Sequence, residues 1–132
     1  MLTIRTVNLK SDKPPVREAL LRLDHALSRA CQEGTVILKV VHGYGSSGAG
    51  GDIRIAVQKR LFELAEAGHI AACIFGEDWS KSNEATWRLL QSHPDLKQDA
   101  DLGRGNPGIT IVVLAQEQKI ATKASKSPRN KQ

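Results

Sequence analysis

A glycine-rich stretch between an apolar run and an amphipathic segment constrains this chain more than any other feature. Residues Thr35–Val41 are almost all apolar or β-branched, which predicts a buried strand. Five of the ten residues from His42 to Gly51 are glycine, and Asp52 is a good N-cap for the amphipathic helix expected after them. The chain therefore contains a strand–loop–helix unit, which is typical of α/β folds.

Further elements extend this unit in both directions. Ser11-Asp12 followed by Pro14-Pro15 is a helix-start signal, with a side-chain cap before prolines that need no backbone partner. Gly34 and Gly68 are expected to end the two main helices. The predicted elements are strand Thr3–Leu9, helix Pro15–Glu33, strand Thr35–Val41, helix Asp52–Ala67, strand His69–Phe75, short helix Ser82–Leu90 and strand Ile109–Leu114. The order β-α-β-α-β-(α)-β predicts a four-stranded sheet covered by helices.

Positive charge is concentrated at the C-terminal end. The net charge is +5, and residues 115–132 hold five of the 19 Lys and Arg but only one of the 14 acidic residues. We expect residues 1–114 to form one α/β domain and residues 115–132 a basic, disordered tail, because the tail has too few apolar groups to offset its ordering entropy. Such a tail either attracts nucleic acid or only maintains solubility, and the sequence leaves both open.

Cysteine usage and hydropathy narrow the class of protein. Cys31 and Cys73 lie alone in apolar runs, with no Cys/His grouping nearby, so we expect reduced core residues, no metal and no cofactor. No run approaches the roughly 18 apolar residues of a membrane span, and the start lacks a signal-peptide layout. The expectation is a cytoplasmic protein without a membrane partner.

The glycine-rich loop is the candidate binding site. Glycine lets a ligand approach main-chain N–H groups, and the positive end of the following helix favours an anion. The alternative is a flexible connector, although ten residues are more than a connection here requires. Tyr44 is expected either to stack on a base or to lie on the sheet. The predicted phosphate-binding residues are Gly43, Tyr44, Gly45, Ser46, Ser47, Gly48, Gly50, Gly51 and Arg54.

Two named phosphate-binding motifs compete for this loop. A Walker A loop is excluded because Gly50 is followed by Gly51-Asp52 rather than by Lys and Ser or Thr. The pattern GxGxxG is matched by Gly43, Gly45 and Gly48, and Glu77 follows the next strand, so a nucleotide- or dinucleotide-binding protein is one alternative. Against it, a full βα unit precedes the motif and too little chain follows for such a sheet.

His42 follows the central strand, where open α/β sheets place their ligands. Its imidazole either donates to a phosphate or moves protons, or it only hydrogen-bonds the loop and holds its shape; both remain open.

Other polar and aromatic residues are given structural interpretations. Arg22, His25 and Arg29 share one helix face that we expect to be solvated; Asp99 and Asp101 are expected in surface turns, and Trp79 and Trp87 in packing.

Three segments in this order resemble the Smr (small MutS-related) domain family: 41–46 (VHGYGS), 52–57 (DIRIAV) and 106–114 (NPGITIVVL). The resemblance spans roughly residues 3–114. It implies a two-layer α/β sandwich with a mixed sheet, similar to the C-terminal domain of the bacterial initiation factor three. It also implies binding of RNA or DNA, with nicking or RNA endonuclease activity. The matching motif residues are His42, Gly43 and Gly45 in the loop and Arg54 in the helix.

The chain departs from the family at the end of the first strand. Family members usually carry Leu-Asp-Leu-His-Gly there, with the Asp and His implicated in cleavage, whereas this chain has Asn8 and Lys10 at those two positions. An amide is no carboxylate base, and an ammonium is no imidazole near neutral pH. The segment 76–103 also looks longer than usual. We therefore predict a nucleic-acid-binding module with weak or no nuclease activity; the alternative is an active endonuclease using His42, with Lys10 as electrostatic stabiliser.

Overall fold

Four short strands form one mixed sheet at the centre of the computed structural model, which describes residues 3–44 and 49–114 without the side chains of 49–51. The strands are β1 (Ile4–Asn8), β2 (Ile37–Val41), β3 (Ala72–Phe75) and β4 (Ile109–Val113). Their order in the sheet is β1-β2-β4-β3, with β1 parallel to β2 and β4 antiparallel to both of its neighbours. The predicted α/β class and four-stranded mixed sheet are confirmed.

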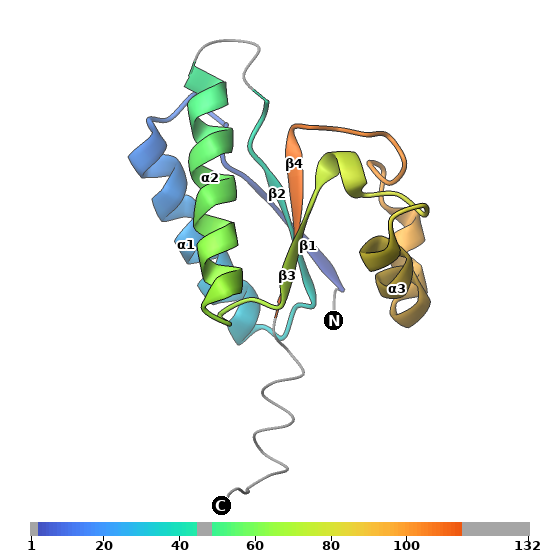
Figure 1. Cartoon of the computed structure of the whole chain (residues 1–132). Coiled ribbons are helices and arrows are strands. Elements are labelled where there is room, and N and C mark those ends of the chain that lie inside the picture. Colours follow the sequence, from blue (N-terminus) through green and yellow to red (C-terminus); the bar gives the residue numbers. More distant parts are fainter. Residues whose placement is uncertain (1–2, 45–48, 115–132) are drawn as a thin grey trace, which may run out of the picture.

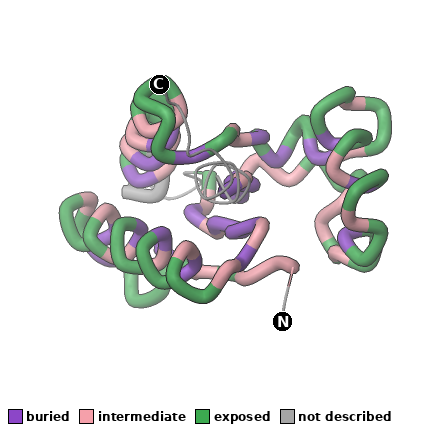
Figure 2. The backbone as a smooth tube through the Cα atoms, turned by 90° about the horizontal axis from the view of Figure 1, so that it is seen from below, coloured by how far each residue is buried: buried purple, intermediate pink, exposed green. Residues whose placement is uncertain are grey.

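The two long helices cover one face of this sheet (Figure 1). They are α1 (Val16–Gln32) and α2 (Ala49–Glu66), and both end before a glycine with positive φ, Gly34 and Gly68, as predicted. Figure 2 shows the buried residues of both helices on the sides turned toward the sheet. This core contains Leu23, Leu27, Val57 and Leu61 from the helices and Leu38, Val40 and Val112 from the strands. Cys31 and Cys73 pack at its margin.

The segment between β3 and β4 lies against the opposite face of the sheet (Figure 1). It contains two 3₁₀ turns, η1 (Gly76–Asp78) and η2 (Pro94–Gln98), and helix α3 (Glu84–Ser92). Trp79, Leu90 and Leu96 from this segment are buried together with Ile37 and Ile111 of the sheet. Trp79 is therefore a core residue, as predicted, whereas Trp87 is largely exposed. The segment gives the sheet a second apolar core.

A buried charged cluster joins this segment to the centre of the sheet. Lys39 of β2 points toward the segment, where its Nζ lies 3.0 Å from Oδ1 of Asp99 and also contacts Asp101. Trp79 Nε1 donates to Asp99 at 3.0 Å, and Asn106 Nδ2 donates to Asp101 at 3.1 Å. The prediction that Asp99 and Asp101 are ordinary surface residues is wrong, because a lysine in the middle of a central strand requires them as partners.

Several element boundaries differ from the prediction at helix starts. Asp52 is not the N-cap of α2: the helix begins at Ala49, and Asp52 lies in its first turn, where a carboxylate interacts favourably with the helix dipole. Helix α1 is preceded by Pro15 without a side-chain cap, because Asp12 and Lys13 form a left-handed turn with φ of 67° and 47°. Asn83 caps α3 by accepting from Thr86 N at 3.0 Å.

The topology brings the ends of three strands to one edge of the sheet. Because β1, β2 and β3 are parallel, the turns that follow Asn8, Val41 and Phe75 meet there, beside the first residues of β4 and of α2. Four predicted loop residues, Gly45, Ser46, Ser47 and Gly48, and the predicted tail 115–132 lie outside the described residues. Within the described part, no helix has the length and hydropathy that a membrane crossing requires.

Candidate functional site

The turn after β1 is fixed by Asn8. Its Oδ1 accepts hydrogen bonds from Lys10 N at 2.9 Å and Ser11 N at 3.0 Å, a local turn typical of asparagine. Leu9 N donates to Val41 O at 2.8 Å, which holds the turn beside the end of β2. The exposed Lys10 side chain lies close to Gly43, since a Cβ placed on Gly43 would lie 3.3 Å from Lys10 Cδ. Lys10, in the turn after β1, thus supplies a cation next to Gly43 at the beginning of the glycine-rich loop.

The beginning of the glycine-rich loop is clamped to the start of β4. The backbone N–H groups of His42 and Gly43 both donate to Gly108 O, at 2.9 and 3.0 Å. Gly43 has a φ of +76°, which favours glycine. Asn106 Oδ1 in turn accepts from Gly108 N at 2.8 Å. Two segments more than 60 residues apart, the Val41–Gly43 end and the 106–108 turn, therefore hold the loop entrance together.

The His42 side chain is fully buried, and both of its ring nitrogens are hydrogen-bonded. Nδ1 lies 2.6 Å from Gly43 O, and since a carbonyl only accepts, Nδ1 carries the proton. Nε2 lies 2.9 Å from Thr110 Oγ1 and accepts from that hydroxyl, which in turn is 3.4 Å from Gln58 Nε2. Burial lowers the pKa of His42, and nearby Arg54 adds to this effect, although the bond to Gly43 O opposes it. Burial thus favours the neutral ring, which is hydrogen-bonded to Gly43 at the entrance of the loop.

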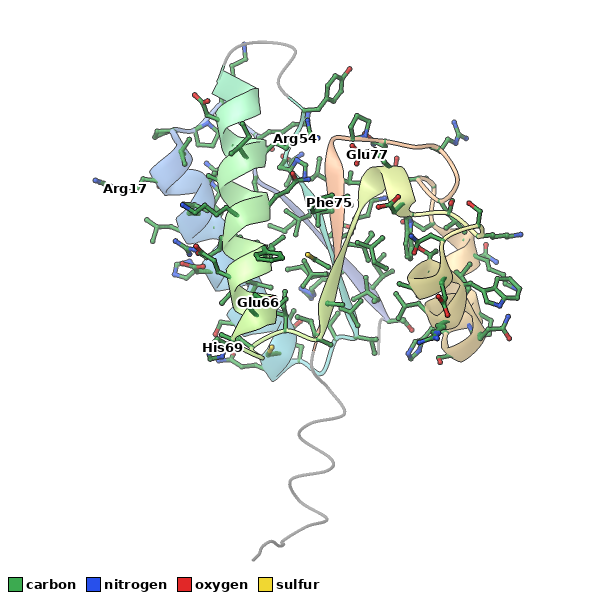
Figure 3. The ribbon with its side chains drawn as sticks, in the orientation of Figure 1. Arg17, Arg54, Glu66, His69, Phe75 and Glu77 are labelled. Atoms are coloured by element: carbon green, nitrogen blue, oxygen red, sulfur yellow. The ribbon has the colours of Figure 1, made fainter. Side chains whose placement is uncertain are left out.

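Arg54 and Glu77 face each other across the gap between α2 and η1 (Figure 3). The distance from Arg54 Nη2 to Glu77 Oε2 is 3.5 Å, and both side chains are partly exposed. The Nε of Arg54, by contrast, is buried and has no hydrogen-bond partner among the described residues. A buried polar atom without a partner is costly, so this guanidinium is only partly satisfied.

Tyr44 places an exposed aromatic ring at this edge. It is 56% exposed, and its Cδ1 would lie 3.5 Å from a Cβ placed on Gly108. Of the two interpretations of Tyr44, the ring is therefore available for stacking rather than covered by the sheet. Lys10, from the turn after β1, lies close to Gly43, and the ring of Tyr44 lies close to Gly108, just before β4.

Of the predicted site residues, the structure brings Lys10, His42, Gly43, Tyr44 and Arg54 to one edge of the sheet. Gly50 and Gly51 lie in the first turn of α2 rather than in a loop, which corrects their predicted position. The sequence analysis did not identify Asn106 as the residue whose side chain holds the turn before β4 by accepting from Gly108 N. The Asn-Pro-Gly sequence before a strand was a signal for this hydrogen bond. Glu77 faces Arg54, and the antiparallel β4 differs from the parallel sheet of dinucleotide-binding folds.

Both cationic and anionic side chains lie at this edge. Its charges include the exposed ammonium of Lys10 and the incompletely paired guanidinium of Arg54, and Glu77 is the carboxylate that contacts Arg54. No group of three or more His, Cys, Asp or Glu side chains is placed to hold a metal ion in the part of the chain that the structure describes. The Nε2 lone pair of His42 is directed at Thr110, so in this conformation the imidazole has no free base for an incoming ligand.

Comparison with solved structures identifies the fold. The crystal structure of the Smr domain of Thermus thermophilus MutS2 is similar to this chain with a TM-score of 0.52. The match covers 83% of this chain and 96% of that domain, at 24% sequence identity. Neither a protein-family model nor a curated protein sequence matches the chain. The chain therefore has the fold of the Smr domain, as its loop and strand motifs predicted.

Proposed function

We propose that this chain is a nucleic-acid-binding module of the Smr type that contacts phosphate groups at the edge formed by Lys10, Gly43 and Arg54. The observation that carries this proposal is the guanidinium of Arg54. Its Nε is buried without a partner among the described residues, and its Nη2 has a 3.5 Å contact to Glu77. A phosphate oxygen at this point would accept from the terminal N–H groups of the partly exposed guanidinium and compete with Glu77 for its charge.

The surroundings of Arg54 support a phosphate rather than an uncharged ligand. The first turn of α2 contributes the positive end of a helix dipole, and Lys10 contributes a second cation beside Gly43. The exposed ring of Tyr44 offers a surface on which an unpaired base can stack, which favours single-stranded RNA or DNA over a duplex. The likeness to the Smr fold is consistent with this class of ligand.

The same proposal includes weak or absent cleavage. Phosphodiester hydrolysis needs a group that accepts a proton and another that donates one to the leaving oxygen. Asn8 uses its side-chain oxygen to hold a turn, Lys10 is a cation, and His42 has both nitrogens engaged in the fold. These residues support binding and charge stabilisation without an acid–base pair.

The test is the affinity for a twelve-nucleotide oligo(U) and oligo(dT), measured by fluorescence anisotropy over a range of salt concentrations. Arg54→Gln is expected to weaken binding and to reduce the salt slope by about 0.7, because one single-strand phosphate is then no longer neutralised. Glu77→Gln is expected to strengthen binding, because it removes the competing carboxylate. Truncation after Leu114 is expected to flatten the slope further if the basic tail also meets phosphates.

Arg88→Gln is the matched control. Arg88 is an exposed helical arginine, ion-paired with Glu84 at 2.6 Å. Its helix α3 lies on the face of the sheet opposite α2 (Figure 1). Equal affinities for the wild type, Arg54→Gln and Arg88→Gln would refute phosphate binding at this edge. Weaker binding in Arg54→Gln alone, with unchanged thermal unfolding, would support it.

A further inference from the structure

A second basic site lies along the free edge of β1, away from the glycine-rich loop. A hollow of about 230 Å³ opens there between β1 and α1, and Arg5, His25 and Arg29 line it. Its floor is apolar and includes Val7 and Ala26. The hollow is smaller than the roughly 300–1,000 Å³ of a drug-sized ligand site, so it fits a single chemical group.

The two arginines that line this hollow come from different elements and share one carboxylate. Arg5 Nη2 lies 3.0 Å from Glu33 Oε1, and Arg29 Nε lies 3.2 Å from Glu33 Oε2. One acidic group therefore orients two guanidinium groups, each of which keeps further N–H donors. The Arg29 side chain is 72% exposed, so these donors are accessible from solvent.

Backbone donors lie on the same edge. Ile37 N donates to Thr3 O and Leu9 N donates to Val41 O, so the odd-numbered residues of β1 face β2. Because successive residues of a strand alternate, the N–H of Thr6 points to the free edge. Among the described residues β1 pairs with β2 alone, and Thr6 lines the hollow.

We propose that this hollow binds a phosphate group in the backbone of the same nucleic-acid strand that the loop edge contacts. A phosphodiester oxygen accepts hydrogen bonds from groups of the kind found here: two oriented guanidinium groups, an imidazole and a main-chain N–H. The inference rests on the proposed function, because it takes the ligand to be nucleic acid.

The position of the hollow suits a continuous strand. From Arg5 to Asn8 the distance along β1 is roughly 10 Å, at about 3.3 Å per residue. A single strand of a few nucleotides is long enough to reach both sites. Arg22, whose Nη1 donates to Ser11 O at 3.0 Å and whose Nε is 3.4 Å from Glu18, lies on α1 beside the turn that follows Asn8. The path from loop to hollow is therefore short, and its loop end carries a further cation.

The sharpest test frees the two arginines instead of removing them. Glu33→Gln leaves Arg5 and Arg29 without their carboxylate and is expected to raise the affinity for twelve-nucleotide oligo(dT) about two- to fivefold, the size of one surface ion pair. Glu84→Gln is the matched control, because Glu84 pairs with Arg88 at i,i+4 just as Glu33 pairs with Arg29. A gain in affinity is an outcome that damage to the fold does not produce.

The complementary variant removes both cations. Arg5→Gln/Arg29→Gln is expected to lower affinity and to reduce the salt slope by about 0.7 for each phosphate that the protein no longer neutralises. Equal affinities in Glu33→Gln and Glu84→Gln, with an unchanged slope in the double variant, would overturn the inference. If Arg54→Gln is then still impaired, the loop edge survives as the sole site. If the hollow variants respond and Arg54→Gln does not, the loop edge fails and the hollow stands; if the wild type binds neither oligonucleotide, both fail.

Discussion

Lys39 Nζ lies 3.0 Å from Asp99 Oδ1, which joins the middle of the central strand to a residue 60 positions further along the chain. Both side chains are about nine-tenths buried. Burial disfavours the charged ammonium, but hydrogen bonds from Nζ to Asp101 and Asp99 outweigh this penalty and raise the pKa of Lys39 above its ordinary value. The position of the whole 76–108 segment on the sheet thus depends on one ion cluster.

Replacement of Lys39 by methionine is expected to destabilise the protein by about 3 kcal/mol, the lower end for breaking a buried ion pair, because Asp101 keeps some exposure to water. Urea unfolding at pH 7 measures this difference. The triple variant Lys39→Met/Asp99→Asn/Asp101→Asn should recover part of the stability, since it leaves no unpaired carboxylate. A single Lys39→Met variant as stable as the wild type would show that the cluster contributes nothing.

Acid should weaken the same cluster through Asp101. The hydrogen bond from Lys39, followed by the bond from Asn106, holds the pKa of Asp101 below its ordinary value. The stabilisation is therefore present above the unfolded pKa of about 3.9 and is lost as the pH falls through the folded pKa. Between pH 5 and pH 3 the unfolding free energy of the wild type should fall more than that of Asp101→Asn. Parallel curves would contradict this assignment.

The order and type of the main elements followed from local pattern. The apolar stripe of α1, the continuous apolar runs of β2 and β4, and the glycines after both helices are local signals, and the structure confirms them. The start of α2 and the side-chain cap of α1 were predicted wrongly. At α2 the glycines at 50 and 51 were assigned to the loop although they lie in the first turn, and at α1 the left-handed turn at Asp12 displaced the expected cap.

The second layer over the sheet could not be predicted in the same way. Lys39 stands in an apolar run and Asp99 in a polar one, and no local pattern links two residues 60 positions apart. The family resemblance implied a two-layer sandwich and left the extra length of residues 76–103 unexplained. At the site, the resemblance identified His42 and Arg54, but the engagement of both His42 nitrogens depends on Thr110, a long-range partner.

At Gly76 the backbone of a neighbouring turn leaves no room for any side chain. A Cβ there would lie 1.8 Å from Asn106 O, a backbone atom in the turn that leads into β4. Gly76→Ala is expected to cost about 3 kcal/mol or more, because the turn that holds the loop entrance has to move. Gly103→Ala is the control: its φ is +80° but nothing lies within 4 Å, so we expect about 1–2 kcal/mol from backbone strain. A smaller loss of stability in Gly76→Ala than in Gly103→Ala, by chemical denaturation, would contradict this account.

His42 should remain neutral near physiological pH. Burial lowers its pKa, so its contribution to stability is present above the unfolded pKa of about 6.5 and is lost as the pH falls through the folded pKa. From pH 7.5 to pH 5.5 the wild type should therefore lose more unfolding free energy than His42→Gln. The other histidines, His25, His69 and His93, are present in both proteins and cancel in the comparison. Nitrogen NMR of the ring should show the proton on Nδ1.

The last prediction concerns cleavage. Wild-type protein is expected to cut RNA and supercoiled DNA weakly or not at all, since loss of one acid–base group costs about 100- to 10,000-fold in rate. Asn8→Asp keeps an oxygen that accepts from Lys10 N and Ser11 N, so the turn should survive the change. Lys10→His would place an imidazole beside Gly43, where the Lys10 chain now lies. The double variant Asn8→Asp/Lys10→His should therefore gain nicking activity if only the groups at positions 8 and 10 are missing, and Asn8→Asp alone, without an imidazole, should not.

The purified wild type, these variants and His42→Ala would be assayed for the length of their cleavage products, with and without chelator. Strong wild-type cleavage that His42→Ala abolishes would refute the prediction and make His42 a catalytic residue of an active endonuclease.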